Sequence, residues 1–416
     1  MKEVIKKVIV ENQKLNPEVK ERNFKLPKTN KIITLSGPRR AGKSYLLFQI
    51  INQLEKENTL YINFDDERLD LTVENLDLIM EGYYELYPER QEQKNHVFLD
   101  EIQNIEGWER FVRRLYEKEN IKLYITGSSS KMFSKELATQ LRGRTLNFEV
   151  YPLDFKEYLK FKDIKLERNY EYTNQRYKIK NEFKEYMEYG GFPEILDEEL
   201  KVKVLQSYLD LMTYKDIIER YNIRNTKLLK NLIKYLLKNH SKEFSIKKYH
   251  NQLKDLKVSK DTIYEYLGYL EETNLVYLLP RQSYSLKKQQ YHNHKVYSVD
   301  TGFINANAYK FSEEKGRLLE NVVFVELKRR EKEIYYYKGK GGCDFVVKEG
   351  LDVIEAVQVC YELNEENQER EVKGLVEAMN EYGLEEGLIL TNDEERVIEE
   401  KGKKIIVKPT WKWLLK

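Results

Sequence analysis

Residues 35–50 read LSGPRRAGKSYLLFQI, and this stretch decides the fold of the first part of the chain. The β-branched run at 31–37, KIITLSG, predicts a buried strand, and residues 44–57 carry the apolar spacing of a helix. Between them lies a full match to G-x-x-x-x-G-K-S, the pattern of a phosphate-binding loop. A strand, a glycine-rich loop and a helix in this order predict a nucleotide site. The alternative is a glycine-rich turn that binds nothing.

The chemistry of this loop suits the phosphates of ATP. Glycine lets backbone N–H groups curl around the β-phosphate, and the amino end of the helix adds positive potential. Lys43 is expected to neutralise the β- and γ-phosphates, and the hydroxyl of Ser44 to ligate Mg²⁺. The residues expected to bind ATP are Gly37, Pro38, Arg39, Arg40, Ala41, Gly42, Lys43 and Ser44.

A pair of acids follows a second apolar run, HVFLDE at residues 96–101. An acid at the carboxyl end of a strand projects into the crevice where open parallel sheets bind ligands. Asp100 is therefore predicted to support Mg²⁺ from its outer coordination sphere, and Glu101 to polarise the attacking water. Two further stretches, at 58–69 and 121–133, predict parallel strands that end at the same edge.

The polar residues after the last of these strands are candidates for contact with the γ-phosphate. Of Thr126 and Ser128, we prefer Ser128 as the catalytic contact. A capping role for the serines is the alternative.

The composition fits a heavily charged globular protein of two or three domains. The chain has 416 residues, of which 41% are hydrophobic and 34% charged, with a net charge of +2. No apolar run approaches the length of a membrane span, and the charged N-terminus lacks the apolar core of a secretory signal. With Cys343 and Cys360 the only cysteines, no disulfide framework is expected and a cytoplasmic location is predicted.

Five stretches together resemble the AAA-type ATPases that are common in archaea and bacteria. They are GPRRAGKS, VFLDEIQNIEGWERFVRRLYE, LYITGSSSKM, ATQLRGRTLNFEVYPLDFKEYL and YMEYGGFPEIL, in that order. The resemblance implies an AAA+ fold, ATP and Mg²⁺ as cofactors, and self-association. It also implies an arginine that reaches a γ-phosphate, commonly that of a neighbouring subunit. Arg142 and Arg144 are the candidates and Arg144 is preferred; a salt-bridged surface turn is the alternative.

The expected fold class is α/β, followed by helical and α+β parts. We expect an AAA+ parallel-sheet domain over residues 1–155 and a helical lid over 156–222. A winged-helix domain over 223–297 and a PD-(D/E)XK nuclease-like domain over 298–416 complete the chain. In the winged-helix segment, three runs with helical spacing precede an alternating, β-rich run. Ser259 is the expected N-cap of the third helix.

The winged-helix segment is strongly basic. Between residues 224 and 296, 15 Lys/Arg stand against 6 Asp/Glu, a net charge of +9 that favours contact with a nucleic acid. Lys260, Lys287 and Lys288 are the candidate contacts to double-stranded DNA. A protein-contact module with solvated lysines is the alternative.

The elements predicted beyond the winged-helix segment run helix, three strands, helix, strand, which resembles the core of PD-(D/E)XK nucleases. The resemblance implies a metal held by an acid on the second strand. On the third strand it implies an acid and a lysine two positions apart. Asp344 matches the first acid, whereas Gln358 and Cys360 stand where the second acid and the lysine are expected. Glu320 or Glu326 is a candidate extra ligand, or an ordinary salt-bridge partner.

These replacements predict a nuclease fold that has lost cleavage. Gln358 keeps an oxygen ligand, but Cys360 removes the positive charge that orients water or stabilises the reacting phosphate. A register with Glu355 as the acid puts Val357 in the place of the lysine, which fits worse. Residues 351–400 carry 3 basic against 16 acidic residues, a net charge of −13 that repels a phosphate backbone.

Two functional hypotheses follow from the sequence. The first is a Mg²⁺-dependent AAA+ ATPase that binds DNA and couples hydrolysis to conformational change there. The second is a nucleotide-controlled switch whose C-terminal domain docks a protein partner or a second copy of the chain. A third hypothesis, an active metal-dependent nuclease, lacks its lysine.

Overall fold

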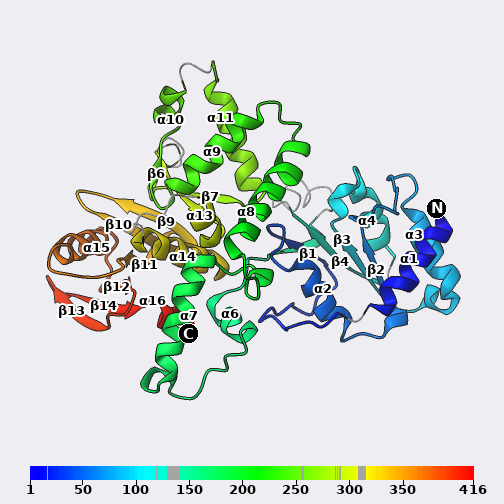
Figure 1. Cartoon of the computed structure of the whole chain (residues 1–416), viewed down its shortest axis with the longest axis horizontal. Helices are drawn as coiled ribbons and strands as arrows, with labels where there is room; N and C mark the ends of the chain where they lie inside the picture. Colours follow the sequence, from blue (N-terminus) through cyan, green and yellow to red (C-terminus); the bar gives the residue numbers. More distant parts are fainter. Residues whose placement is uncertain are drawn as a thin grey trace. The chain divides into compact units, whose positions relative to one another are not determined.

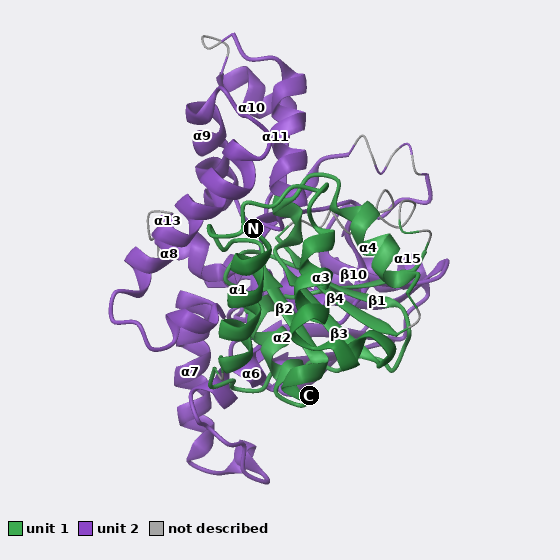
Figure 2. Ribbon diagram, turned by 90° about the vertical axis from the view of Figure 1, so that its right-hand side faces the viewer, with its two compact units in different colours: residues 1–150 green, residues 151–416 purple. Residues whose placement is uncertain are grey.

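The computed structural model describes residues 1–15, 17–118, 120–128, 141, 143–253, 257–285, 287, 289, 292–307 and 315–416. It divides into two compact units, residues 1–150 and 151–416, which Figure 2 shows in green and purple. None of the helices in these ranges combines the length and the apolar character needed to cross a membrane.

The first unit is built on a five-stranded sheet in the order β2-β3-β4-β1-β5 (Figure 1). All of its strand pairs are parallel, as the sequence predicts. The strands are β1 (Ile32–Ser36), β2 (Thr59–Asn63), β3 (Asn95–Asp100), β4 (Ile121–Gly127) and β5 (Thr145–Glu149). Because β1 and β3 both pair with β4, the loops after these three strands meet at one edge of the sheet.

Apolar clusters cover both faces of this sheet, because successive strand residues point to opposite sides. Leu99 belongs to the cluster on one face and Phe98 to the cluster on the other. The helices on the first face are α1 (Lys2–Lys14), α3 (Asp77–Leu86) and α4 (Trp108–Tyr116). The second face carries α2 (Lys43–Ile51), which begins directly at the phosphate loop. This layering leaves the carboxyl edge of the sheet as the place for the site.

The second unit begins with helices and a small sheet. The helices are α6 (Phe155–Phe161), α7 (Gln175–Tyr189), α8 (Lys201–Leu211), which continues as a π-helix (Met212–Glu219), α9 (Thr226–Lys238), α10 (Ile246–Gln252) and α11 (Lys260–Glu272). An antiparallel sheet in the order β6-β8-β7 follows, with β6 (Glu243–Phe244), β7 (Val276–Leu279) and β8 (His294–Ser298). Three helices and a pair of antiparallel strands therefore lie where the sequence predicts them in residues 223–297.

The rest of the second unit is built on a mixed sheet in the order β13-β14-β12-β11-β10-β9. Its elements are α13 (Thr301–Asn307), α14 (Lys315–Arg329), β9 (Glu333–Lys338), β10 (Gly342–Glu349), β11 (Asp352–Val359), α15 (Gln368–Tyr382), β12 (Glu386–Thr391), β13 (Arg396–Glu400), β14 (Lys403–Pro409) and α16 (Thr410–Leu414). From α14 to β12 the order is helix, three strands, helix and strand, as expected; β13 and β14 extend the sheet beyond that prediction.

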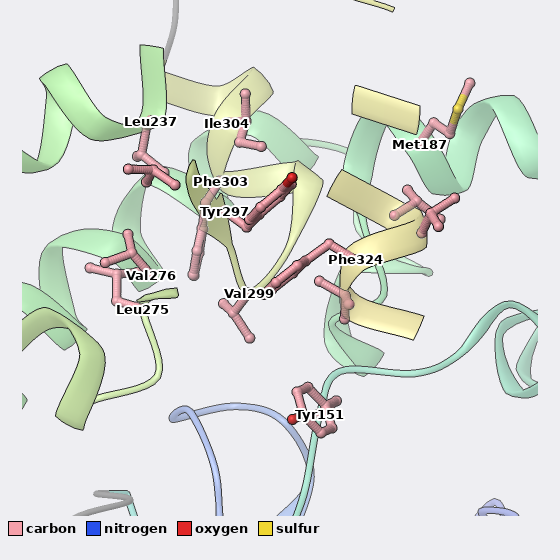
Figure 3. Close-up of a cluster of buried hydrophobic side chains, with 14 of the residues drawn as sticks. Tyr151, Met187, Leu237, Leu275, Val276, Tyr297, Val299, Phe303, Ile304 and Phe324 are labelled. Atoms are coloured by element: carbon pink, nitrogen blue, oxygen red, sulfur yellow. The ribbon is translucent and has the colours of Figure 1, made fainter. Parts of the chain in front are cut away.

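One hydrophobic core runs through much of the second unit, so the segments expected beyond residue 155 are not separated from one another. Tyr297 of β8 stacks on Phe324 of α14, with ring centroids 4.0 Å apart and planes 2° from parallel (Figure 3). The same core contains Tyr151 at its beginning and Trp411 near its end. The boundary expected between residues 297 and 298 therefore falls inside a shared core, and the first unit ends at Val150.

Candidate functional site

The loop between β1 and α2 takes a conformation that only glycine accommodates at two positions. Gly37 has a φ of 151°, and a Cβ atom there would lie 2.1 Å from the carbonyl oxygen of Val150. Gly42 has a φ of 93° and precedes the first residue of α2. The loop thus turns tightly against the end of β5 and delivers the amino end of α2 to its concave side.

Lys43 is held inside this loop. Its ammonium donates to the carbonyl oxygens of Gly37, at 3.1 Å, and Pro38, at 3.2 Å, and the residue is 4% exposed. The same nitrogen lies 3.4 Å from Oε1 of Glu101. The predicted phosphate ligand and the predicted water-activating acid are therefore in direct contact.

Asp100 is fully buried at the end of β3 and accepts several hydrogen bonds. Tyr61 donates its hydroxyl to Oδ2 at 2.7 Å, Thr126 donates to Oδ1, and the side chain of Ser44 is also hydrogen-bonded to this carboxylate. Burial, followed by the neighbouring charge of Glu101, raises the pKa of Asp100 above its ordinary value. Ser44 and Asp100, the two residues expected at Mg²⁺, are thus brought together.

Glu101 sits directly beyond the strand in a left-handed conformation, with a φ of 53°. Its backbone N–H donates to the hydroxyl of Thr126 at 3.0 Å. Thr126 is therefore hydrogen-bonded to both Asp100 and Glu101. Burial favours the neutral form of Glu101, but the charges of Lys43 and Arg39 outweigh it, and the pKa of Glu101 is lowered. The carboxylate is therefore ionised at neutral pH, as an acceptor of a proton must be.

Gln103 is a residue of this site that the sequence analysis missed. Its amide nitrogen donates to Oε2 of Glu101 and lies 3.4 Å from the hydroxyl of Ser128. Ser128 is 1% exposed and follows β4 directly. The amide of Gln103 thus links the predicted base to the predicted γ-phosphate contact. The letters EIQN after Asp100 mark a turn, and nothing in them distinguishes Gln103 from an ordinary polar loop residue.

The residues at this edge fit a nucleotide with Mg²⁺. The loop supplies a buried ammonium and the start of a helix, which suit phosphate oxygens. Ser44 and Asp100 supply hydroxyl and carboxylate oxygens, which hard cations prefer. Two buried oxygens at this edge, Ser36 Oγ and Gln103 Oε1, have no hydrogen-bond partner in the described part of the chain.

Arg144 does not reach the phosphate loop of its own chain. Its guanidinium pairs with Glu117 at 3.0 Å and lies 5.3 Å from the ring centroid of Tyr116. Its carbonyl accepts from the N–H of Ile32, the first residue of β1, whereas the loop follows the last residue of that strand. Arg144 therefore lies at the opposite edge of the sheet, and a role at the nucleotide of a neighbouring copy stays a prediction. Arg142 lies outside the described residues.

Two of the three predicted DNA contacts, Lys260 and Lys287, are on the surface of the second unit. Lys260 is the first residue of α11, and Ser259 caps that helix by accepting from the N–H of Thr262 at 3.0 Å, as predicted. Lys260 and Lys287 are both exposed. Lys288 lies outside the described residues.

A buried lysine lies between two of the acids predicted for the nuclease-like site. The ammonium of Lys295, from β8, lies 2.8 Å from Oδ1 of Asp344 and 2.9 Å from Oε1 of Glu320. Tyr297 also donates to Glu320, at 2.7 Å. Burial lowers the pKa of Lys295, but the negative charges of Asp344 and Glu320 outweigh burial, so the pKa of Lys295 is raised. Burial, and after it the charge of Asp344, raises the pKa of Glu320 to about 7. We call Lys295, Glu320 and Asp344 the lysine–carboxylate cluster.

The other residues predicted for this site have different surroundings. Gln358 accepts from the N–H of Asp344 at 3.1 Å and donates to Glu371 at 2.5 Å. The thiol of Cys360 is buried and donates to the carbonyl of Glu362. In the described ranges, no group of three or more His, Cys, Asp or Glu side chains is arranged to hold a metal ion.

Glu326, the alternative extra ligand, pairs with Arg329 and Arg330 and has the ordinary role. Lys295 therefore places a positive charge beside both Glu320 and Asp344. It comes from the preceding segment, where no local pattern points to Glu320 or Asp344.

Comparisons with known proteins agree with the geometry of the first unit. Residues 29–159 match the model of an AAA domain, and residues 180–314 match a domain of unknown function (DUF8612). Among solved structures, the Walker-type ATPase paby2304 of Pyrococcus abyssi has a TM-score of 0.42 and 16% identity, covering 66% of this chain and 90% of that one. Likeness at this level carries no inference about what the chain binds.

Two relatives match most of the chain at higher sequence identity. The uncharacterized protein MJ1544 of Methanocaldococcus jannaschii is 41% identical over 404 residues, covering 93% of this chain and 88% of that protein. An uncharacterized protein of Haemophilus influenzae is 33% identical over 353 residues, covering 82% and 85%. The chain therefore belongs to the same family as MJ1544, and its first unit is a P-loop domain of the AAA ATPase type.

Proposed function

We propose that the protein hydrolyses ATP with Mg²⁺ at the carboxyl edge of the first sheet. The observation that carries this proposal is the convergence of Lys43, Ser44, Asp100 and Glu101, with Lys43 and Glu101 only 3.4 Å apart. A phosphate-binding lysine and an ionised carboxylate at one edge are what phosphoryl transfer to water requires.

Each side chain has a separate task in this mechanism. The loop N–H groups and Lys43 bind the phosphates, so the ammonium leaves Glu101 for the phosphate oxygens. Released from that ion pair, Glu101 accepts a hydrogen bond from the attacking water and then its proton. Ser44 would ligate Mg²⁺ and Asp100 would support the ion from its outer coordination sphere; when bound, Mg²⁺ supplies charge neutralisation of the phosphates. Ser128, linked to Glu101 through Gln103, lies where it would contact the γ-phosphate.

ATP turnover of the wild type and of Glu101→Gln tests this proposal. The variant keeps the size of the side chain but removes its basicity, so turnover is expected to fall by about 10²-fold or more while ATP binding remains. Glu106→Gln, an exposed acid five positions along, is the matched control and should hydrolyse ATP at the wild-type rate. Equal turnover in the wild type and Glu101→Gln would refute the proposal.

DNA binding by residues 223–297 is the second part of the proposed function. Support comes from three helices followed by the antiparallel pair β7 and β8, and from the net charge of +9 between residues 224 and 296. We assign this segment as a winged helix with Lys260, Lys287 and Lys288 toward double-stranded DNA. Neutralised phosphates release counterions, so the affinity should fall steeply with salt.

A duplex-binding titration across salt concentrations tests the DNA contact. Lys260→Gln/Lys287→Gln/Lys288→Gln is expected to weaken binding and to lower the salt slope by about one for each phosphate that is no longer neutralised. The control replaces three exposed lysines elsewhere, Lys7, Lys373 and Lys401, with Gln. No affinity at low salt would remove the DNA half and favour a nucleotide-controlled switch that docks a protein partner.

The mixed-sheet part of the second unit is proposed to keep a nuclease-like fold without cleavage. The supporting observation is the lysine–carboxylate cluster, in which an ammonium lies between the two acids that would otherwise hold a metal. Incubation of a DNA duplex with the protein and Mg²⁺ or Mn²⁺ is expected to leave the duplex intact. Cleavage that disappears in Asp344→Ala would contradict this assignment.

A further inference from the structure

A cavity in the first unit lies at the edge of the sheet away from the phosphate loop. It has a volume of about 650 Å³. Its walls come from the carboxyl half of α2, the first residues of β3 and β4, and the segment 24–30. Because the strands are parallel, the amino ends of β3 and β4 lie at the opposite edge from the loop that follows β1. The cavity is therefore separate from the proposed ATP site.

The charged side chains that line this cavity are all basic. Lys28, Lys94 and Lys122 line it together with His96, and none of the described residues that form its wall is acidic. Lys28 and Lys94 are both exposed. In a chain with 70 acidic and 72 basic residues, a cavity with three lysines and no acid is an unbalanced positive site.

Lys122 and His96 give this cavity a fixed, partly buried floor. The ammonium of Lys122 donates to the carbonyl of Thr29 at 2.8 Å and to that of Lys31, and the residue is 9% exposed. Nδ1 of His96 is buried and has no hydrogen-bond partner among the described residues. Burial, and after it repulsion by Lys94, lowers the pKa of Lys122 to about 8. Burial and repulsion by Lys94 also lower the pKa of His96. An anion in the cavity would relieve this repulsion.

Apolar and amide groups complete the wall. Phe24 packs edge-on against Phe148, with centroids 5.8 Å apart, and Tyr124 stacks on Phe98 at 4.5 Å. Gln53 lines the cavity from the end of α2. A volume in the range of small-molecule sites, with apolar walls and a few polar groups on one side, suits an organic ligand rather than a bare ion.

We propose that this basic pocket (Lys28, Lys94, His96 and Lys122) binds a small organic phosphate of about nucleotide size. The phosphate lies toward the lysines and the flat body lies against the apolar wall. The pocket is a second ligand site on the first unit, and its occupation does not depend on the phosphate loop.

Calorimetric titration of AMP into the Lys43→Ala chain at low salt tests the proposal, because this substitution disables the phosphate loop. We expect one AMP per chain. Lys28→Gln/Lys94→Gln in the same background should weaken AMP binding about tenfold or more, because each charge pair that is removed contributes up to about a fivefold effect. Lys56→Gln/Lys118→Gln, at two exposed lysines outside the pocket, is the matched control and should bind AMP normally. Adenosine, which lacks the phosphate, should bind at least about tenfold more weakly than AMP.

Three results would overturn the proposal. The first is that Lys43→Ala does not bind AMP, and the second is that the pocket variant and the control variant bind AMP with equal affinity. The third is that a short DNA duplex displaces AMP, because a polymer backbone would then be the natural source of the phosphate. Failure of the ATPase proposal is a different result, since it would appear as absent ATP turnover in the wild type. AMP binding to Lys43→Ala does not depend on that turnover.

Discussion

The ammonium of Lys295 lies 2.8 Å from Oδ1 of Asp344, although 49 residues separate the two in the chain. The same nitrogen lies 2.9 Å from Glu320, so one cation is shared by two carboxylates. Lys295 thereby ties the small antiparallel sheet to the mixed sheet. It also places a buried positive charge between the two acids predicted to hold a metal.

Removing this cation should destabilise the second unit. Lys295→Met leaves two carboxylates buried side by side, and we expect it to lower the free energy of unfolding by about 3–5 kcal/mol. Urea denaturation followed by circular dichroism measures the change. Lys340→Met, at an exposed lysine, should change stability little. Lys295→Met/Glu320→Gln/Asp344→Asn should recover most of the stability, because no uncompensated charge remains; a triple variant as unstable as the single one would contradict the charge argument.

The stability of the second unit should fall between about pH 4 and pH 7 through Glu320. Its pKa is about 7 in the folded protein, above the ordinary value of about 4.3 for glutamate, so the folded state holds a proton that the unfolded state has lost. The contribution of Glu320 to the free energy of unfolding is therefore fully present at low pH and is lost as the pH rises through 7. Asp300, with a pKa raised to about 7 by burial, acts in the same direction.

Thermal melting of the wild type and of Glu320→Gln at pH 5 and pH 8 measures this effect. The melting temperature of the variant should depend less on pH than that of the wild type, because the amide does not titrate. Asp300→Asn should remove a further part of the dependence. A pH dependence unchanged in Glu320→Gln would show that the carboxyl group does not take up a proton on folding.

Gln103 is expected to act on turnover rather than on ATP binding. Its amide positions Glu101 and lies beside Ser128, so Gln103→Ala should lower kcat by about 10- to 100-fold while the KM for ATP changes little. Steady-state kinetics separates the two constants, and Gln91→Ala, at an exposed glutamine, is the control. A rise in KM with unchanged kcat would assign Gln103 to nucleotide binding instead.

Gly37→Ala should disrupt the phosphate loop far more than Gly143→Ala. The new Cβ at position 37 would lie 2.1 Å from the carbonyl oxygen of Val150, so the backbone must shift. Gly143 also has a positive φ, 70°, but a Cβ there meets no atom of a described residue within 4 Å, and only about 1 kcal/mol of backbone strain is expected. ATP titration should show at least tenfold weaker binding for Gly37→Ala only, by about 1.4 kcal/mol or more. Equal weakening in both variants would point to strain alone.

The phosphate site was largely predictable because its signals are local. The spacing of Gly37, Gly42 and Lys43 follows from the loop itself, and the acids Asp100 and Glu101 directly end an apolar run. Strand–loop–helix order then assigned them to one edge of a parallel sheet. Gln103 escaped prediction because its contacts with Glu101 and Ser128 depend on how the loops after β3 and β4 lie beside each other.

The edge of the sheet at which Arg144 lies could not be predicted from the family resemblance alone. The letters LRGR before a strand favour an arginine at a phosphate, but the strand that follows is parallel to β1, so its beginning lies at the amino edge. Within one chain, Arg144 lies at that edge and contacts Glu117 and Tyr116. Sequence alone does not give the distance between the two edges.

The sequence by itself determined the glycine-rich loop between its strand and helix, and the order of elements in the last third, because these depend on residues close together in the chain. Only the tertiary structure decided how residues 151–416 share one core and which cation meets Asp344. Those outcomes depend on packing between residues separated by tens of positions, such as Tyr297 on Phe324 and Lys295 between Glu320 and Asp344. Burial makes such contacts strong. Because the partners are far apart in the chain, no local sequence pattern predicts these contacts.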